Sequence, residues 1–207
     1  MQPDSSEQLR GRGSRKATVE RETRETRVAL TLDLDGTGRA AVSTGLGFFD
    51  HMLDLVAGHG LLDLMVAAVG DLQTGGHHTV EDVGICLGSA VAEAVGDKKS
   101  INRYGSILLP MDESLALVAI DLSGRPYFAY EGGPSATSIA GFDTALVAEF
   151  FRAFVNNARA TLHVRVLAGE DAHHMIEAVF KGFGKALGQA VALDPRVPGI
   201  PSTKGVL

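Results

Sequence analysis

The sequence is poor in cysteine, in long apolar stretches and in positive charge, and each shortage narrows what the protein can be. Among 207 residues the only cysteine is Cys86, so no disulfide can form within one chain and a cysteine-based zinc site is disfavoured. No apolar run approaches the roughly 20 residues that span a bilayer. With 19 basic and 25 acidic residues the formal net charge is −6, which argues against a general nucleic-acid-binding protein.

Several familiar motifs are missing as well. The N-terminal segment has no apolar core of the signal-peptide kind, and residues 1–15 are expected to form a disordered polar tail. Together with the lone cysteine this predicts a cytoplasmic protein. There is no Walker loop and no dinucleotide-binding G-x-G-x-x-G after a strand. The glycines in "KGFGKALG" follow helical spacing, so we expect them to pack against a neighbouring helix.

Hydrophobic periodicity divides the first half of the chain into strands and helices. Alternating apolar residues predict strands within 27–38 and 39–45, and a third within 61–71. Helical spacing predicts a helix over 47–60, which ends at glycine, and a longer one over 79–99. The order is therefore strand, strand, helix, strand, helix.

The second half repeats this order. Two strands are expected within 114–132 around a Ser-Gly turn, followed by a helix over 143–158, a strand over 161–169 and a helix over 172–191. We infer an internal duplication, with repeats over about 16–100 and 101–195. Consecutive antiparallel strands with helices gathered on one face predict an α+β fold and one domain over 16–207.

A doubled histidine motif occurs once in each repeat. "GGHHTVED" contains His77, His78 and Glu81, and "DAHHMIEA" contains the same H-H-x-x-E pattern. On a helix, residues four apart share a face, whereas neighbours diverge by about 100°. His77 can therefore chelate an ion with Glu81 while His78 points elsewhere. Each motif should accordingly serve two metal ions.

Two crossed ligand sets complete these ions most simply. Imidazole and carboxylate donors suit Mn²⁺, with Fe, Co or Zn as substitutes. One set joins His77 and Glu81 to His174, and the other joins His173 and Glu177 to His78. His51 would add a nitrogen to one ion, and Glu149 is its counterpart in the second repeat. Because adjacent histidines splay apart, we expect the two halves of a site to come from different subunits.

The chain resembles the imidazoleglycerol-phosphate dehydratases of histidine biosynthesis. The resemblance rests on "GFFDHML", "GGHHTVED", "NRYGSILLPMDESL", "DLSGRP", "LHVRVLAGEDAHHMIEAVFKGFGKAL" and "PSTKGVL", which follow in order from about residue 17 to the C-terminus. It implies a duplicated fold of the ribosomal protein S5 domain 2-like type, two Mn²⁺ ions per active site and a homo-oligomer of 24 subunits with shared metal sites.

The resemblance also assigns residues to the metals. The implied ligands are His51, His77, His78, Glu81, Glu149, His173, His174 and Glu177. At one of these positions the chain departs from the family, which often has histidine where this chain has Glu149. Glutamate still binds hard divalent ions, so the residue remains a candidate.

The implied reaction removes water from D-erythro-imidazole glycerol phosphate to give imidazole acetol phosphate. The departing hydrogen is not beside a carbonyl, so the ring must supply the activation. Binding both ring nitrogens between two metals would favour an imidazolate that expels the hydroxyl. A carboxylate then takes the neighbouring hydrogen, and Glu177 and Glu25 are the candidates. Asp112 and Glu113 are expected either to support the metal ligands or to form a turn.

The substrate phosphate requires positive charge in an otherwise acidic protein. Arginine suits bidentate phosphate contacts. The resemblance implies that Arg103 and Arg125 bind the phosphate, within a substrate-binding set of Glu25, Arg103, Arg125, Ser202, Thr203, Lys204 and Gly205. The last four lie in a C-terminal segment, 196–207, that we expect to close over bound phosphate.

Two other functions remain open from the residues alone. A two-metal phosphatase or other hydrolase would use the same metals and arginines but release inorganic phosphate. A metal-stapled assembly protein would use the histidine motifs only to join subunits. Such a protein has no need of Arg103, Arg125 and Lys204, so these three residues favour a catalyst.

Overall fold

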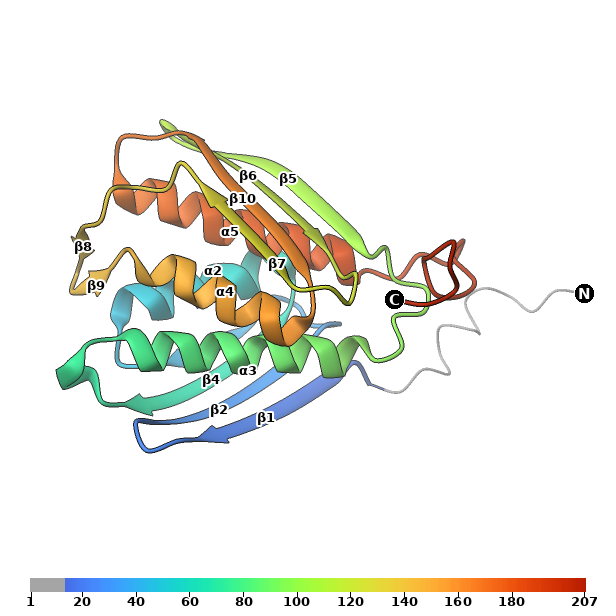
Figure 1. Ribbon diagram of the computed structural model, residues 1–207, viewed down its shortest axis with the longest axis horizontal. Helices are drawn as coiled ribbons and strands as arrows, with labels where there is room; N and C mark the ends of the chain where they lie inside the picture. Colours follow the sequence, from blue (N-terminus) through green and yellow to red (C-terminus); the bar gives the residue numbers. More distant parts are fainter. Residues whose placement is uncertain (1–13) are drawn as a thin grey trace, which may run out of the picture.

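Each half of the chain builds a four-stranded sheet, and four helices lie between the two sheets in the computed structural model, which describes residues 14–207 (Figure 1). The first half contains β1 (Lys16–Glu22), β2 (Thr26–Asp33), β3 (Ala40–Ser43), α2 (Gly47–Gly60), β4 (Asp63–Gly70), the short 3-10 helix η1 (Leu72–Thr74) and α3 (His77–Val95). The second half contains β5 (Tyr104–Met111), β6 (Ser114–Asp121), β7 (Tyr127–Glu131), β8 (Ser138–Ile139), β9 (Phe142–Asp143), α4 (Leu146–Ala158), β10 (Thr161–Ala168) and α5 (Ala172–Val191).

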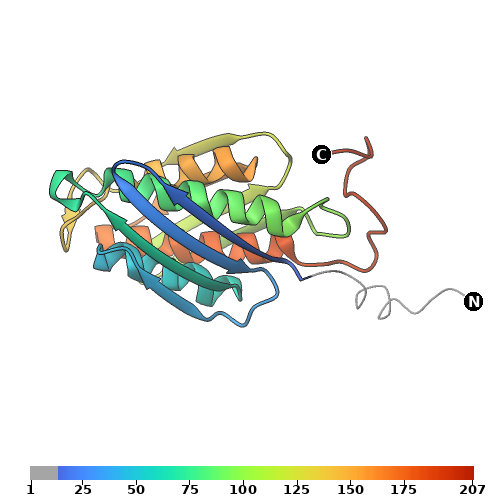
Figure 2. The ribbon, with the colours of Figure 1, turned by 90° about the horizontal axis from the view of Figure 1, so that it is seen from below.

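The two sheets have the same topology. Their strand orders are β1-β2-β4-β3 and β5-β6-β10-β7, so each strand of the first sheet has a counterpart in the second. This confirms the duplicated α+β fold. Seen from below, the first sheet covers the helices as a twisted layer (Figure 2). The domain boundaries at 16–100 and 101–195 stay a proposal, and most of the expected tail, 1–15, lies outside the described residues.

Each four-stranded sheet has one strand more than the sequence pattern predicted, and the short pair β8 and β9 was not predicted either. β1 and β5 were missed because both are edge strands, pairing only with β2 and β6. The sequence of β1, KATVERE, is mostly charged, and β5 contains Gly105 and Pro110, which weaken a strand signal. The antiparallel expectation was also wrong for β3 and β7, which run parallel to β4 and β10, because α2 and α4 form the crossover connections between them.

The helices join the two halves of the chain. Helix α2 packs against α5 and α3 packs against α4, so each contact links one repeat to the other. Five phenylalanines are fully buried between the sheets and contact one another through edge-to-face and tilted ring pairs: Phe150, Phe151, Phe154, Phe180 and Phe183. The interior is therefore shared, and it fixes the long helices relative to each other. None of the helices within 14–207 combines the length and apolar character that a bilayer crossing requires.

Glycines let the paired helices approach closely. A Cβ atom on Gly184 of α5 would lie 2.6 Å from the carbonyl oxygen of Val56 in α2, and one on Gly84 of α3 would lie 2.6 Å from that of Phe150 in α4. Real side chains essentially never come so near to backbone. The prediction that the glycines of "KGFGKALG" serve helix packing is thus confirmed for Gly184.

We predict that Gly184→Ala lowers the free energy of unfolding by about 1–3 kcal/mol, because the new methyl group overpacks a backbone contact. Gly58→Ala is the matched control. Gly58 lies in α2 with no atom within 4 Å of its would-be Cβ, so alanine there should raise stability by up to about 1 kcal/mol. Urea unfolding midpoints of the two variants measure the difference. Equal midpoints would contradict the close-packing argument.

Candidate active site

Three predicted ligands meet at one end of the helical layer. Helix α2 carries His51, and the first turns of α5 carry His173 and Glu177. One atom of each lies within 4.8 Å of one atom of the others. Glu177 Oε2 is 3.5 Å from His51 Nε2 and 3.0 Å from His173 Nε2. The sequence did not show which histidine–glutamate pair His51 joins. The packing of α2 on α5 brings His51 to His173 and Glu177.

Glu177 is the most enclosed member of this group. Its side chain is only 9% exposed, and its second oxygen, Oε1, lies 2.6 Å from Lys181 Nζ one helical turn later. Burial alone would raise the pKa of the Glu177 carboxyl, but the hydrogen bonds from Lys181 and His173 outweigh it and the pKa is lowered. Both oxygens of Glu177 are therefore engaged. Sequence reasoning missed Lys181, although a Glu-Lys pair four residues apart on a helix is a recognisable signal.

The corresponding residues of the first repeat are arranged more loosely. His77 Nε2 and Glu81 Oε2 are 3.9 Å apart on α3, as the helical spacing predicted. Glu149 on α4 is the counterpart of His51, but its carboxylate lies 3.8 Å from Arg152 Nε. Within residues 14–207 it does not join His77 and Glu81 in a three-residue metal-binding group. Glu149 is thus not brought to a metal position by one chain alone.

The second histidine of each pair points away from the first and meets a carboxylate. His174 Nδ1 lies 2.8 Å from Glu113 Oε2, and His78 Nδ1 lies 3.1 Å from both oxygens of Asp71. The hydrogen bond that His174 donates to Glu113 raises the pKa of His174, and the one that His78 donates to Asp71 raises the pKa of His78. Asp71 was missed because it is brought to His78 only by the turn after β4.

Glu25 occupies the turn between β1 and β2, beside the first histidine pair. Its negative charge contributes to the raised pKa of His78, which places it near that ring. Its carboxylate is exposed and has no hydrogen bond or ion pair in the part of the chain that the structure describes. The turn itself is anchored, because Asp82 of α3 accepts hydrogen bonds from Thr26 Oγ1 and from Arg21 Nε, the latter at 2.8 Å.

The predicted phosphate-binding residues surround a separate cavity of about 730 Å³. Arg103 is the anchor: it donates to both oxygens of Asp121, at 2.7 and 3.1 Å, and to the carbonyl oxygen of Pro201 at 2.9 Å. Arg125 is 71% exposed and 4.0 Å from Asp121, so its guanidinium is available to an anion.

The C-terminal segment forms one wall of this cavity. Ser202, Thr203 and Lys204 line it, and Gly205 lies next to the lining residues. The segment turns back on itself, since Gly205 N donates to the carbonyl oxygen of Ser202 at 3.0 Å, and Gly205 adopts a φ of 72° that favours glycine. The structure thus brings the arginines and the terminal residues together, as predicted.

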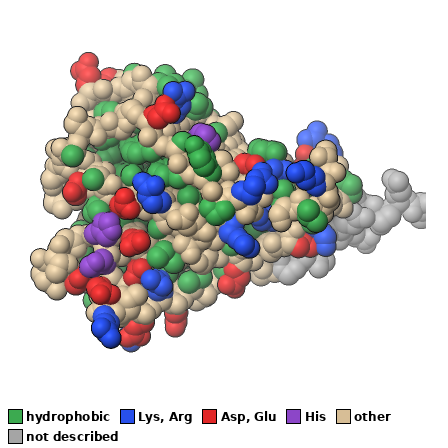
Figure 3. All heavy atoms as spheres, in the orientation of Figure 1, with side chains coloured by type: hydrophobic (Ala, Val, Ile, Leu, Met, Phe, Trp, Pro, Cys, Tyr) green, Lys and Arg blue, Asp and Glu red, His purple; other side chains and the backbone are tan. Residues whose placement is uncertain are grey.

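The histidine group and the anion cavity lie at opposite ends of the subunit. His173 is in the first turn of α5, whereas Arg103 N donates to the carbonyl oxygen of Ala190 near its last turn. From His173 to Ala190 the helix rises by about 25 Å. In Figure 3, two histidines lie among carboxylates at the left edge, and lysine and arginine side chains gather farther right.

Comparisons with known proteins identify the family of this chain. The sequence model of the family described as imidazoleglycerol-phosphate dehydratase matches residues 44–187. The chain belongs to this family. It is 59% identical over 194 residues to the imidazoleglycerol-phosphate dehydratase of Moorella thermoacetica, covering 94% of this chain and 99% of the relative.

Solved structures of dehydratases from this family have the same fold. The crystal structure from Staphylococcus aureus subsp. aureus N315 is 41% identical with a TM-score of 0.78 and covers 86% of this chain and 99% of its own. That from Pyrococcus furiosus is 36% identical with a TM-score of 0.79 and covers 91% and 100%. The chain is therefore a dehydratase, a lyase, and the phosphatase and assembly-protein alternatives are not favoured.

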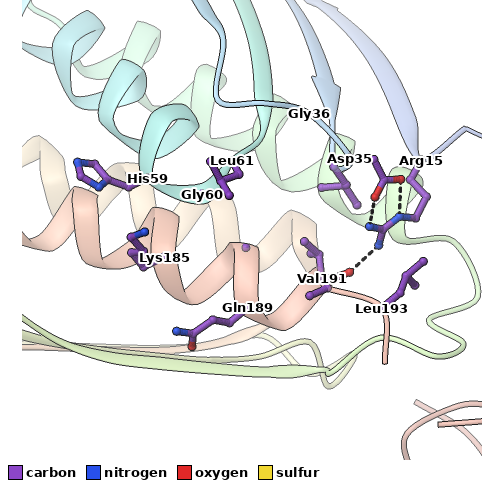
Figure 4. Close-up of a pocket in the computed structure, with 13 residues that line it drawn as sticks. Arg15, Asp35, Gly36, His59, Gly60, Leu61, Lys185, Gln189, Val191 and Leu193 are labelled. Atoms are coloured by element: carbon purple, nitrogen blue, oxygen red, sulfur yellow. Dashed lines mark hydrogen bonds and ion pairs between the residues drawn. The ribbon is translucent and has the colours of Figure 1, made fainter. Parts of the chain in front are cut away.

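A further groove of this dehydratase, about 660 Å³, lies between the C-terminal ends of α2 and α5 (Figure 4). His59 and Lys185 line it, and Arg15 crosses it to donate to Asp35 at 2.9 Å and to the carbonyl oxygen of Val191 at 2.5 Å. Burial and the charges of nearby lysines lower the pKa of His59. None of the predicted metal ligands borders this groove, and Arg15 there ties the first sheet to α5.

Proposed function

We propose that the protein converts D-erythro-imidazole glycerol phosphate into imidazole acetol phosphate in histidine biosynthesis, with two Mn²⁺ ions in each active site. The observation that carries the proposal is the group of His51, His173 and Glu177, which offers two imidazoles and a buried carboxylate to one ion. Such a donor set suits Mn²⁺. The cytoplasm is the proposed location, because a chain with a single cysteine forms no intrachain disulfide.

The function is tested by incubating metal-stripped and Mn²⁺-reloaded protein with imidazole glycerol phosphate. We expect imidazole acetol phosphate to accumulate only with the reloaded protein. Inorganic phosphate measured in the same samples should stay at background. Phosphate release, or no ketone product from metal-loaded protein, would overturn the proposal.

The proposed ligands are His51, His77, His78, Glu81, Glu149, His173, His174 and Glu177. When bound, the metal ions act as Lewis acids and as a template that orients the imidazole ring of the substrate. In the proposed reaction the side chains of the protein bind the phosphate, keep the imidazole ring aligned and remove one proton.

Glu25 is the proposed base, and Glu177 is a ligand rather than a base. Both oxygens of Glu177 already have partners, His51, His173 and Lys181, so neither is free to take a proton. Glu25 has a carboxylate without a partner within residues 14–207, beside His78. A base must have an oxygen within reach of the hydrogen it removes. The unengaged carboxylate of Glu25 supports its assignment as the base, and the engaged oxygens of Glu177 support its assignment as a ligand.

The proposed phosphate site consists of Arg103, Arg125, Ser202, Thr203, Lys204 and Gly205. Arg103 holds the wall formed by the terminal segment, while Arg125 and Lys204 offer charge to the phosphate. We propose that residues 196–207 close over the bound phosphate and exclude water. Closure should slow proteolysis of this segment when a substrate analogue is present, and equal cleavage rates would argue against it.

One substrate molecule has to use two subunits. The metal group and the phosphate cavity of one chain are separated by the length of α5, about 25 Å from His173 to Ala190. A three-carbon chain between an imidazole and a phosphate is far shorter. We therefore propose that the metal end of one subunit meets the phosphate end of another, within a symmetric assembly of 24 subunits. His78 and His174 would complete metal sites across such interfaces.

A further inference from the structure

The second histidine of each pair, His78 and His174, has a neighbouring carboxylate at Nδ1, whereas within the described part of the chain the first histidine does not. His174 presents Nδ1 to Glu113, and His78 presents Nδ1 to Asp71. His173 instead directs Nε2 at Glu177 on its own helix. A carboxylate only accepts hydrogen bonds, so the ring nitrogen that faces it must carry the proton. In a neutral ring the other nitrogen, Nε2, then keeps its lone pair.

The carboxylate that faces His174 is held firmly. Glu113 Oε1 accepts hydrogen bonds from the backbone N–H of Asp171 at 3.0 Å, from that of Glu170 at 3.3 Å and from Ser114 Oγ at 3.0 Å. Its other oxygen, Oε2, is left for the imidazole. Because all three donors meet Oε1, the orientation of the carboxylate is fixed by its surroundings.

The two repeats reach this arrangement from different sequence positions. Glu113 lies in the turn between β5 and β6, whereas Asp71 follows β4. In the second repeat the acid just before the histidine pair is Asp171, which accepts from His173 N at 2.7 Å and so caps α5. Helix α3 has no such side-chain cap. Duplication alone therefore does not account for the two carboxylate–imidazole pairs.

We propose that Glu113 and Asp71 are positioning residues, which hold His174 and His78 with the proton on Nδ1 and leave Nε2 as the nitrogen for a metal ion. The inference rests on the proposed function, since it takes both histidines as metal ligands. Groups that orient a metal-bound histidine in this way typically contribute about 10- to 100-fold to metal affinity.

Glu113→Gln provides a discriminating test. The three donors around Oε1 require an oxygen there, so the amide oxygen of glutamine occupies that place and the NH₂ group faces His174 Nδ1. An NH₂ group donates, so Nδ1 must become the acceptor and the proton moves to Nε2. The ligand nitrogen is then blocked. Glu113→Ala removes the partner without imposing the wrong tautomer.

Titration of the metal-free full-length protein with Mn²⁺, followed by the EPR signal of the free ion at a pH where imidazole is neutral, measures the effect. We expect Glu113→Gln to bind about 10- to 100-fold more weakly than wild type, and more weakly than Glu113→Ala. A purely structural role in the loop predicts the opposite order, because glutamine keeps the shape and the Oε1 hydrogen bonds. Glu113→Gln binding as tightly as wild type, or Glu113→Ala binding more weakly than Glu113→Gln, would overturn the inference.

Two further variants complete the test. Glu170→Gln removes the same charge at an exposed neighbouring position and should bind Mn²⁺ like wild type. Asp71→Ala should weaken binding as Glu113→Ala does, because it removes the carboxylate whose two oxygens lie 3.1 Å from His78 Nδ1. A wild-type protein that binds no Mn²⁺ would refute the proposed function itself. Tight wild-type binding with an equally tight Glu113→Gln variant would refute only the positioning role.

Discussion

We expect the replacement of Glu25 with glutamine to lower kcat by about 10²- to 10⁴-fold, the usual contribution of a general base. The side chain keeps its size, and Glu25 has no partner among residues 14–207, so the fold and the metal content should be unchanged. Steady-state kinetics with imidazole glycerol phosphate, together with metal analysis of the purified variant, measure both quantities.

Glu22→Gln is the matched control for this variant. Glu22 ends β1 three residues before Glu25, and its exposed carboxylate pairs with Arg27 at 2.9 Å. It carries the same charge at the same hairpin, so its loss should leave kcat within a few-fold of wild type. If Glu25→Gln retains wild-type kcat, or if both variants lose activity equally, Glu25 is not the base.

Glu177→Gln should abolish activity by a different route, through loss of metal. Glu177 Oε2 is the oxygen that His51 and His173 share, and a neutral amide cannot replace it as an anionic ligand. We expect the affinity of this site for Mn²⁺ to fall by more than about 100-fold. Changes to groups that only orient the ligands already lower metal affinity by about 10- to 100-fold. Thermal unfolding of the metal-free variant checks that the helices remain packed.

The comparison variant is Glu149→Gln. Glu149 is the family-implied ligand that the structure pairs with Arg152 instead. If it binds metal only through a second subunit, its variant should lose less affinity than Glu177→Gln. Full Mn²⁺ binding and full activity of Glu177→Gln would remove the main support for the metal group.

Helical spacing explains how much of the site was visible in the sequence. A pattern such as H-H-x-x-E converts directly into geometry, so the pairs His77 with Glu81 and His173 with Glu177 followed from residue numbers alone. The core strand β2 was equally clear from its alternation. The edge strand β1 was not, because only Ala17 and Val19 alternate with polar residues and the rest of the strand is charged.

The rest depends on tertiary structure. Asp71 reaches His78 through a turn, and His51 joins Glu177 because α2 packs on α5 rather than on the next helix in sequence. No local pattern encodes either contact. The choice between Glu25 and Glu177 as base likewise required the partners of both carboxylates. The separation of the metal group from the phosphate cavity became evident only once the direction of α5 was known.

The central claim is that each active site combines the metal end of one subunit with the phosphate end of another, and mixing two inactive variants tests it most directly. Glu177→Gln impairs the metal group and Arg103→Gln impairs the phosphate cavity. When the two variant chains are co-expressed so that they assemble at random and are supplied with Mn²⁺, a shared site has two intact halves in about a quarter of the pairings. We predict recovery of about a quarter of wild-type activity from the mixture. Activity no higher than that of either variant alone would contradict the shared site.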